Sequence, residues 1–163
     1  MVEDIVRSFG FLTLGTRMKR IGEKLQADTQ KIMDELGAPL QASQYPFLAA
    51  IDRLGPLAVG ELAEAIGITQ PGATRTVAQL VELGMLEAEP APDDLRRRIV
   101  SLSKEGERLV ATAKRDVWPR IRDAVAELCG DLDGPLLDQL AAIENGLSEV
   151  SLDSRAKRGK AKP

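Results

Sequence analysis

The sequence predicts a mainly α-helical protein with one small β-hairpin, and three observations support this fold class. Apolar residues recur every three or four positions near both ends of the 163-residue chain, which is the spacing of one helix face. Two shorter helical segments surround Gly67 in the middle of the chain. Two strand-like runs then flank a turn rich in Pro and Asp. A chain of this length suits one domain, or a small domain with helical extensions.

The composition excludes most catalytic and metal-binding chemistry. The chain has no His and a single Cys, Cys129, which excludes Ser-His-Asp and Cys-His nucleophiles and zinc sites built from His and Cys. We therefore expect no metal and no cofactor. A lone cysteine forms no disulfide framework, as in a reducing cytoplasm. Residues 1–15 carry acids before any Lys or Arg, and they predict neither a signal peptide nor a membrane span.

The charge is unevenly distributed along the chain. The formal net charge is −3, but residues 154–163 hold five Lys or Arg and no acid, so 17 Lys and Arg face 25 Asp and Glu in the remainder. An acidic body argues against nonspecific wrapping of nucleic acid, although a local basic patch can still dock on phosphates. The chain beyond Ser151 lacks the apolar residues needed for a core, so we expect it to be disordered.

The first two helices are predicted from apolar spacing and from start and stop signals. A long amphipathic helix is expected over about residues 5–36. A second helix begins at the N-cap Ser43, tolerates Pro46 in its first turn and stops at Gly55. The apolar connector 57–59 follows.

A helix-turn-helix pair is predicted in the stretch GELAEAIGITQPGATRTVAQLVELG. Its first helix covers about residues 61–66, and Gly67 permits the sharp turn that follows. The second helix begins at Thr69, a good N-cap, and ends against Gly84. Both helices are too short to be stable alone, so they must pack together.

A hairpin and two more helices complete the chain. The runs MLEAEP and RRRIVSLS flank the turn APDD and predict a β-hairpin. Ser103 then caps a second long helix, which reaches Leu128. Pro119 lies inside this helix and should kink it, because it removes a backbone donor and crowds the carbonyl of Arg115. A last helix is predicted over residues 136–150.

On a helical wheel, the helix from Thr69 has an apolar inward face and a polar outward face. The inward residues are Ala73, Val77, Leu80 and Val81; the outward residues are Gly72, Arg75, Thr76 and Gln79, with Thr74 at the flank. Arg can hydrogen-bond twice to guanine and Gln twice to adenine in the DNA major groove, and a flanking hydroxyl suits a phosphate. An ordinary polar surface helix would show the same face, so this face alone leaves both interpretations open.

The hairpin suggests a role for the consecutive arginines Arg96, Arg97 and Arg98. If the hairpin directly follows a recognition helix, arginines at its turn can reach the adjacent minor groove and its phosphates. Asp93 or Asp94 can pair with one of them to orient the tip, and an exposed pair of this kind contributes only about 0 to 1 kcal/mol. Solvated charge with internal pairing is the alternative for any single arginine.

These segments together resemble the MarR family of winged helix-turn-helix transcription regulators. The resemblance covers nearly the whole chain and is carried by VGELAEAIGITQPGATRTVAQLVELGML and DDLRRRIVSLSKEGERL. The residues that match the family pattern are Thr69, Gln70, Pro71, Thr74, Arg75, Leu80, Gly84, Asp94, Arg96, Leu102, Ser103 and Gly106. Leu95 and Ala88 stand where the family often has wing arginines. Arg97 or Arg98 can compensate for them, so the arginine that enters the minor groove is left open.

The resemblance implies a cytoplasmic regulator, a repressor, that binds double-stranded DNA as an intertwined homodimer. Residues 1–40 and 104–153 would form the dimer around a DNA-binding module at 41–103, with a basic tail at 154–163. The implied DNA-binding residues are Thr69, Gln70, Gly72, Thr74, Arg75, Thr76, Gln79, Arg96, Arg97 and Arg98, and Asp94 would orient the wing. The apolar seams of three long helices independently favour self-association, since a module of about 60 residues cannot bury them. Dimer symmetry implies a pseudo-palindromic operator with half-sites about 10 bp apart.

The resemblance also implies a small lipophilic or aromatic effector, held in a cleft between the dimerisation helices and the DNA-binding lobe. The candidate pocket residues are the aromatic side chains Phe9, Phe11, Tyr45, Phe47 and Trp118. Simple core packing would also account for each of them taken singly.

Two other classes of function are considered. The winged fold can serve as a protein-interaction module whose basic hairpin contacts an acidic partner, because fold does not dictate function. An enzyme that uses Asp93 and Asp94 ranks far below, since adjacent carboxylates on an exposed turn lack an enclosed pocket.

Overall fold

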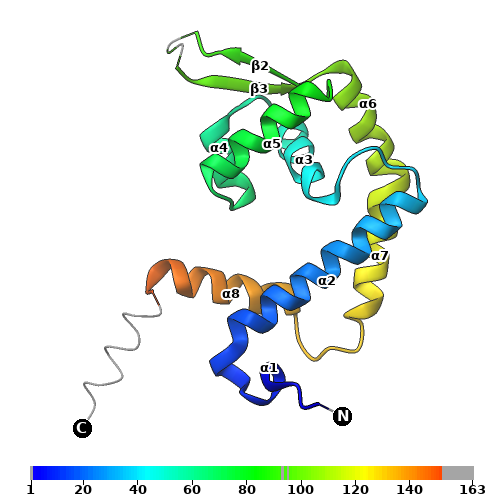
Figure 1. The fold of residues 1–163 in the computed structure, drawn as a ribbon, viewed down its shortest axis with the longest axis vertical. Helices are drawn as coiled ribbons and strands as arrows, with labels where there is room; N and C mark the ends of the chain where they lie inside the picture. Colours follow the sequence, from blue (N-terminus) through cyan, green and yellow to red (C-terminus); the bar gives the residue numbers. More distant parts are fainter. Residues whose placement is uncertain (1, 93, 95, 152–163) are drawn as a thin grey trace. The chain divides into compact units, whose positions relative to one another are not determined.

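The computed structural model of the chain describes residues 2–92, 94 and 96–151. They belong to two compact units, Met1–Ile121 and Arg122–Pro163. Helices dominate and one small antiparallel sheet is present, which confirms the predicted fold class (Figure 1). The tail at 154–163, predicted to be disordered, lies outside the described residues. The functional division of the chain at 41 and 103 stays a prediction.

The N-terminal helix is interrupted. Helix α1 covers Ile5–Ser8, a 3₁₀ turn covers Gly10–Thr13, and helix α2 covers Leu14–Glu35. Gly10 has a φ of +55°, which breaks the helix after α1. The hydroxyl of Thr13 donates a hydrogen bond of 2.7 Å to a carbonyl of α1 and closes the bend. The prediction of one helix from residue 5 was therefore wrong, because apolar spacing continues across a glycine whatever conformation it adopts.

Helix α3 covers Tyr45–Leu54 and starts later than predicted. A 3₁₀ turn at residues 42–44 leads into it, and Ser43 caps neither element. The side-chain oxygen of Gln44 accepts a hydrogen bond from the backbone N–H of Gln41 at 3.0 Å. A glutamine thus supplies the polar cap that the sequence pattern had assigned to the serine.

Helices α4 (Val59–Ile66) and α5 (Gln70–Glu82) form the predicted helix-turn-helix. Gly67 ends α4 in the left-handed conformation, with a φ of 76°. The hydroxyl oxygen of Thr69 accepts a hydrogen bond from the backbone N–H of Gly72 at 3.3 Å and caps α5. The predicted turn and the predicted N-cap are both confirmed.

The apolar face of α5 is narrower than predicted. Ala73, Val77 and Leu80 are buried, as expected, but Val81 is 39% exposed. At about 100° per residue, Val81 lies about 80° around the helix from Ala73, at the edge of the buried arc. The prediction that it points inward was wrong.

The sheet has three strands in the order β1-β3-β2. Strands β2 (Leu86–Pro90) and β3 (Arg98–Leu102) form the predicted antiparallel hairpin, here called the wing. Strand β1 (Leu57–Ala58) pairs with the other edge of β3, with Leu57 opposite Val100. The sequence showed β1 only as an apolar connector, because two residues are too few to reveal alternation.

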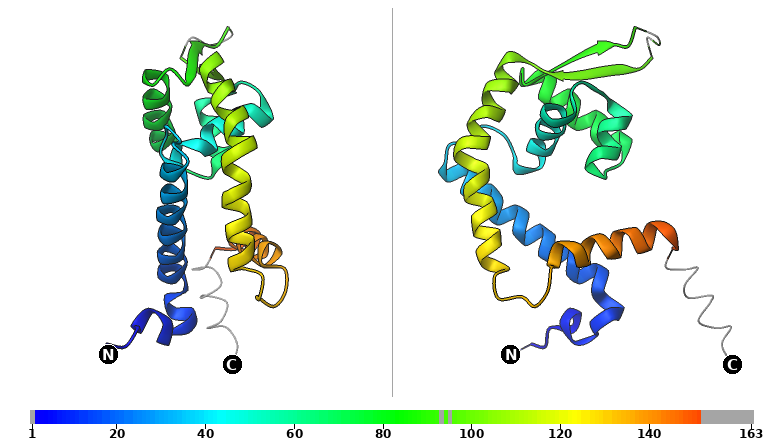
Figure 2. Two further views of the ribbon diagram at one scale, coloured as in Figure 1. Left: turned by 90° about the vertical axis from the view of Figure 1, so that its right-hand side faces the viewer. Right: turned by 180° about the vertical axis from the view of Figure 1, so that it is seen from behind.

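One hydrophobic core joins the helix-turn-helix to the wing and to helix α6 (Lys104–Thr112). Figures 1 and 2 show α3, α4 and α5 gathered below the wing, with α6 beside them. The largest fully buried side chains are Leu48 of α3, Leu62 of α4, Leu80 of α5, Leu86 of β2, Val100 of β3 and Val110 of α6. Each of these elements contributes one, so they are held together as a single lobe.

Ser103 connects the base of the wing to the end of α5. Its hydroxyl accepts a hydrogen bond from the N–H of Gly106 at 3.0 Å, which confirms the predicted cap, and donates one to the carbonyl of Gly84 at 2.6 Å. Its backbone N–H donates to the carbonyl of Met85 at 3.1 Å. A Cβ added at Gly106 would lie 2.1 Å from that carbonyl oxygen. Only glycine therefore allows α6 to start so close to the chain that leaves α5.

Helix α6 passes into helix α7 (Trp118–Leu128) through a π-helical turn at Ala113–Val117. Pro119 has no N–H to give to the carbonyl of Arg115, and its ring crowds that carbonyl. A wider turn relieves both problems. The irregularity predicted at this proline thus takes the form of a π turn.

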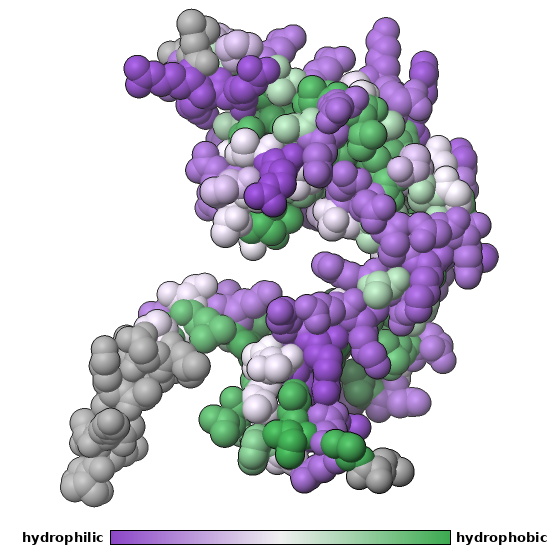
Figure 3. All heavy atoms as spheres, in the orientation of Figure 1, coloured by the Kyte–Doolittle hydropathy of each residue, from purple (hydrophilic) through white to green (hydrophobic). Residues whose placement is uncertain are grey.

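Several helices expose apolar side chains. Met33 is the only buried residue of α2, while Met18, Ile21 and Leu25 are exposed on one side of it. Figure 3 shows hydrophobic residues at the surface over α1. None of the described residues 122–151, which include helix α8 (Leu136–Glu149), is buried. The exposed apolar residues of this second unit are Val125, Leu128, Leu132, Leu137, Ile143 and Leu147. No helix in the described ranges is both long and apolar enough to cross a membrane.

We predict that Gly106→Ala lowers the free energy of unfolding by about 1–3 kcal/mol, because the added methyl group must displace backbone at Met85. Urea unfolding measures the change. Gly15→Ala is the matched control, since Gly15 also lies in a first helical turn and its Cβ would meet nothing within 4 Å. Equal unfolding midpoints for the two variants would contradict the close approach.

Candidate nucleic-acid interface

The polar residues of α5 lie on the face opposite the core. Arg75 and Gln79 are exposed, while Gly72 and Thr76 are half-buried beside them. Thr69 and Gln70 are exposed at the start of the helix, and Thr74 is exposed at the flank. The structure thus presents all seven predicted helix residues on the outer side of α5 or at its N-terminal end.

The two threonines of this face hydrogen-bond to their own helix. The Thr74 hydroxyl donates to the carbonyl of Gln70 at 2.9 Å, and the Thr76 hydroxyl donates to that of Gly72 at 3.2 Å. Each side chain therefore presents its methyl group and oxygen lone pairs outward. A phosphate is an acceptor, so Thr74 must release its carbonyl partner before it can donate to one.

Gln70 lies against α4. Its side-chain amide is 3.9 Å from the position that a Cβ on Gly60 would occupy. This is an ordinary van der Waals distance, so the exposed Gln70 side chain lies near the start of α4, at the end of α5 where N–H groups point outward. The nearest acid on α5 itself is Glu82, at its far end.

The wing projects beyond the helices (Figures 1 and 2), and Asp94 shapes the turn before β3. The Asp94 carboxylate accepts a hydrogen bond from the backbone N–H of Arg96 at 2.9 Å, and its carbonyl accepts one from the N–H of Arg97 at 2.9 Å. This is an Asx turn. Asp94 thus shapes the wing through backbone amides, whereas we had predicted a pair with a guanidinium. Asp93, the other candidate, lies outside the described residues.

The three arginines of the wing have different surroundings. The guanidinium of Arg98 donates a hydrogen bond of 2.6 Å across the hairpin to the carbonyl of Ala88. The guanidinium of Arg97 lies 4.0 Å from the Glu61 carboxylate. Arg96 is exposed near the tip, and its guanidinium has no hydrogen-bond or ion-pair partner among the residues that the structure describes. Arg96 is therefore the wing arginine best placed to meet an outside phosphate or base.

Sequence reasoning did not single out Glu61. Its capping role could have been predicted from the sequence, because an acid at the third residue of a helix commonly accepts a hydrogen bond from the N–H of the residue before that helix. Its proximity to Arg97 could not have been predicted, because it depends on the pairing of β1 with β3.

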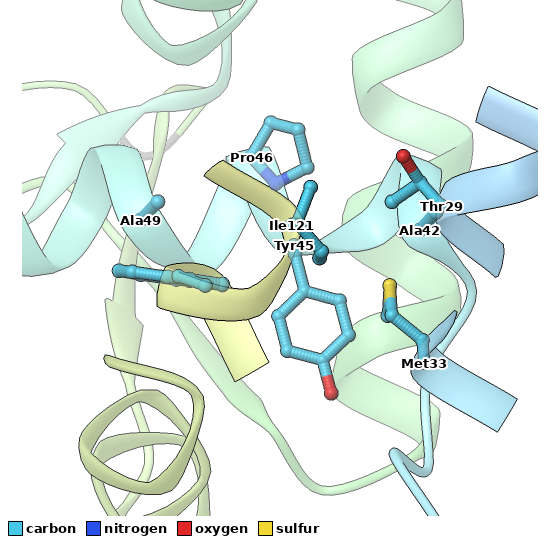
Figure 4. Close-up of a pocket in the computed structure, with 8 residues that line it drawn as sticks. Thr29, Met33, Ala42, Tyr45, Pro46, Ala49 and Ile121 are labelled. Atoms are coloured by element: carbon cyan, nitrogen blue, oxygen red, sulfur yellow. The ribbon is translucent and has the colours of Figure 1, made fainter. Parts of the chain in front are cut away.

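A small apolar groove lies beside α3 (Figure 4). It has a volume of about 240 Å³, below the roughly 300–1,000 Å³ of pockets for drug-sized ligands, so a single-ring compound is the size that fits. Its lining residues come from α2, from α3 and the turn before it, and from the start of α7: Thr29, Met33, Ala42, Tyr45, Pro46, Ala49, Trp118 and Ile121.

The predicted aromatic residues do not all meet at this groove. Tyr45 and Trp118 line it, whereas Phe47 is buried in the core. Phe9 and Phe11 are 55% and 94% exposed, before α2 begins, and neither lines the groove. The five are grouped in the sequence because the segments that hold them are expected at one junction, but the position of a segment carries no information about side-chain direction.

Tyr45 lines the groove, but its hydroxyl oxygen is buried. The residue is only 5% exposed, and its hydroxyl has no hydrogen-bond partner within the described part of the chain. Burial raises the pKa of Tyr45 above its ordinary value, and an approach to the Leu40 backbone that falls short of hydrogen-bond geometry lowers it only in part. The hydroxyl is therefore protonated at neutral pH and can donate a hydrogen bond.

The sequence comparisons identify relatives of the central segment. Residues 38–97 match the model of the MarR family. An uncharacterized HTH-type transcriptional regulator of Mycobacterium leprae is 35% identical over 78 residues, which cover 48% of this chain and 54% of that protein. The chain thus spans about half the length of the curated relatives it matches.

Solved structures share the fold over a longer range. A mutant MarR from E. coli, complexed with operator DNA, is 22% identical, with a TM-score of 0.68 over 91% of this chain and 99% of that chain. BpsR of Bordetella bronchiseptica, whose DNA binding is regulated by 6-hydroxynicotinic acid, is 20% identical, with a TM-score of 0.68 over 83% and 93%. MarR-family proteins are transcriptional regulators rather than enzymes. Residues 38–97, which hold the helix-turn-helix and the first strand of the wing, therefore match the MarR family, in agreement with the family resemblance of the sequence.

Proposed function

We propose that the protein is a homodimeric repressor that binds a pseudo-palindromic operator and is released by a small aromatic effector. The observation that carries this proposal is the outer face of α5, where exposed Arg75 and Gln79 lie on the same lobe as a wing with Arg96 near its tip. A helix of this kind fits the major groove, and a basic hairpin beside it can reach the minor groove. The E. coli MarR complex, with operator DNA on the same fold, supports this assignment.

The side chains of α5 divide the work of recognition. Arg75 offers two donors to a guanine, and Gln79 pairs a donor with an acceptor toward an adenine. Gly72 has no side chain to hold the helix away from the groove floor. Thr76 offers a methyl group and lone pairs, because its hydroxyl proton is used within the helix. Base readout therefore rests on Arg75 and Gln79, while Arg96 contributes attraction to the backbone and minor groove.

Exposed apolar helix faces support the homodimer. One side of α2 is exposed, and no described residue of 122–151 is buried. Apolar faces of this extent are normally covered by a partner. A second copy is the economical partner, since a two-fold axis brings identical faces together. The same axis would place two α5 helices about one DNA turn, or about 10 bp, apart.

The groove beside Tyr45 supports effector response. A single aromatic ring fits its size, and the Tyr45 hydroxyl, which is buried in this structure, would have to become accessible to donate to an acceptor on that ring. The regulation of BpsR by 6-hydroxynicotinic acid shows that this fold can couple such a compound to DNA binding. The effector must bind the arrangement of the free protein more tightly than that of the DNA complex, because equal affinity would shift nothing.

We predict different losses for Arg75→Ala and Arg96→Ala. Duplexes selected from a random library by the wild-type protein supply the operator, and affinities are measured as a function of salt. Arg75→Ala should reduce discrimination between operator and random duplex by about 1–3 kcal/mol. Arg96→Ala should weaken both alike and reduce the slope of log K against log salt by about 0.9.

Lys19→Ala is the charge-matched control, because Lys19 is exposed on α2 and carries the same charge away from α5 and the wing. Its binding should equal that of the wild type. Equal, weak wild-type binding to every duplex would reject sequence-specific recognition.

We predict that the protein sediments with twice the chain mass at micromolar concentration. Ile21→Glu should convert it to a single copy, because a carboxylate on the exposed apolar side of α2 cannot be buried in an interface without a partner. Operator affinity should fall with it. Lys24→Glu, on the same helix, tests for a general effect of charge and should leave the mass unchanged. A wild-type protein that persists as one copy would exclude the dimer.

We predict that Tyr45→Phe leaves the melting temperature at pH 7 unchanged or raises it, since it removes a buried hydroxyl without a partner. Because the folded-state pKa is raised, the tyrosine contributes stability that is full below pH 10.0, its ordinary pKa, and is lost above it. The variant should therefore lose less stability than the wild type in this alkaline range.

The same variant should respond less to hydroxylated aromatic acids that release the wild-type protein from its operator. Phe47→Leu disturbs the core without removing a hydroxyl. It should lower the melting temperature by the same amount at pH 7 and in the alkaline range. A clear fall in the melting temperature of Tyr45→Phe at pH 7 would show that the hydroxyl has a partner in the folded protein.

A further inference from the structure

Glu61 stands where the first helix of the helix-turn-helix meets the wing. It is the third residue of α4, and one carboxylate oxygen, Oε2, accepts a hydrogen bond from the backbone N–H of Ala58 at 2.7 Å. Ala58 belongs to β1 and pairs with Ile99 of β3. The carboxylate is therefore fixed beside β3, which begins at Arg98, directly after Arg96 and Arg97.

The second oxygen of this carboxylate faces Arg97. Oε1 of Glu61 lies 4.0 Å from a terminal nitrogen of the guanidinium. The backbone of Arg97 is held next to the turn of the wing. Its N–H donates a hydrogen bond to the carbonyl of Asp94 at 2.9 Å, and its carbonyl accepts one from the N–H of Ala91 at 2.8 Å. The two side chains are 47% and 56% exposed, so a phosphate can reach the pair.

We propose that Glu61 is a positioning residue that competes with DNA phosphates for Arg97. The inference rests on the proposed DNA binding and adds a determinant of its strength. A guanidinium that moves from the carboxylate to a phosphate exchanges one anionic partner for another, so its net gain is small. Arg97 then contributes less to affinity than Arg96, although both are exposed and belong to the same wing.

The competition acts on all duplexes alike. Phosphate contacts carry no direct sequence information, so a weaker contact lowers operator and random binding by the same factor. Glu61 therefore sets overall affinity and salt dependence, and leaves base preference to α5.

Glu61→Gln tests the proposal in the full-length protein. The amide oxygen can still accept the N–H of Ala58, so the start of α4 is kept while the charge is removed. Affinity for random and selected duplexes should rise about two- to fivefold at low salt. The slope of log K against log salt should steepen by up to about 0.9, because one more phosphate is neutralised.

A double-mutant cycle with Arg97→Ala separates this effect from general charge. Arg97→Ala should reduce affinity more in the Glu61→Gln background than in the wild type. Glu64→Gln is the matched control, because Glu64 is exposed on the same helix and has no ion-pair partner among the described residues. In the Arg97→Ala background, Glu61→Gln should raise the DNA affinity no more than Glu64→Gln does.

Equal gains for Glu61→Gln and Glu64→Gln, additivity with Arg97→Ala, or a lower affinity of Glu61→Gln would each overturn the competition. If Glu61→Gln does not fold, Arg97→Ala and Arg96→Ala decide: a smaller loss of salt slope for Arg97→Ala supports the proposal, and an equal loss overturns it. A wild-type protein that binds no duplex at low salt would instead reject the proposed function itself.

Discussion

The contact between the start of α6 and the end of α5 is the constraint on which the DNA-binding lobe depends. Ser103 binds the carbonyl of Gly84 on one side and the N–H of Gly106 on the other, and both ends of the wing meet at this point. Because no Cβ fits at Gly106, the approach is as close as backbone allows. The wing therefore cannot tilt against α5 without breaking these hydrogen bonds. A fixed angle between the two is what simultaneous contact with two DNA grooves requires.

Charge is arranged around this rigid lobe in an economical way. The body of the chain is acidic, which disfavours broad attraction to nucleic acid, while the wing carries three consecutive arginines and α5 carries Arg75. Even within the wing, two of three guanidinium groups have partners in the protein: Arg98 at Ala88 and Arg97 at Glu61. In the proposed function, such pairing would limit indiscriminate binding. It would leave the bases, read from α5, as the larger part of the difference between an operator and other DNA.

The sequence was sufficient for the helix-turn-helix, its caps and the hairpin, because these depend on local signals such as Gly67 and Thr69. It failed where distant parts meet. The pairing of β1 with β3, and with it the approach of Glu61 to Arg97, arises from sheet topology and not from spacing. The interruption at Gly10 was missed because the presence of a glycine in the sequence does not reveal its φ. The polar face of α5 was predictable as a face, but the direction of each threonine hydroxyl required the structure.

The groove at Tyr45 lies where a ligand can act on the DNA-binding lobe. Its walls include α3, and α3 packs against α4, β3 and α6, so a ring inserted beside Tyr45 presses on a helix that belongs to the same core as α5. An ion pair also connects α3 to the π turn, where the ammonium group of Lys114 lies 2.5 Å from the carboxylate of Asp52. A well-packed core transmits displacement because it is not easily compressed. A ligand that moves α3 must therefore either move the whole lobe with it or strain the π turn. Irregular turns of this kind deform more readily than a regular helix. In the proposed regulator, coupling between groove and DNA would thus follow from how α3 is anchored, without any contact between the ligand and α5.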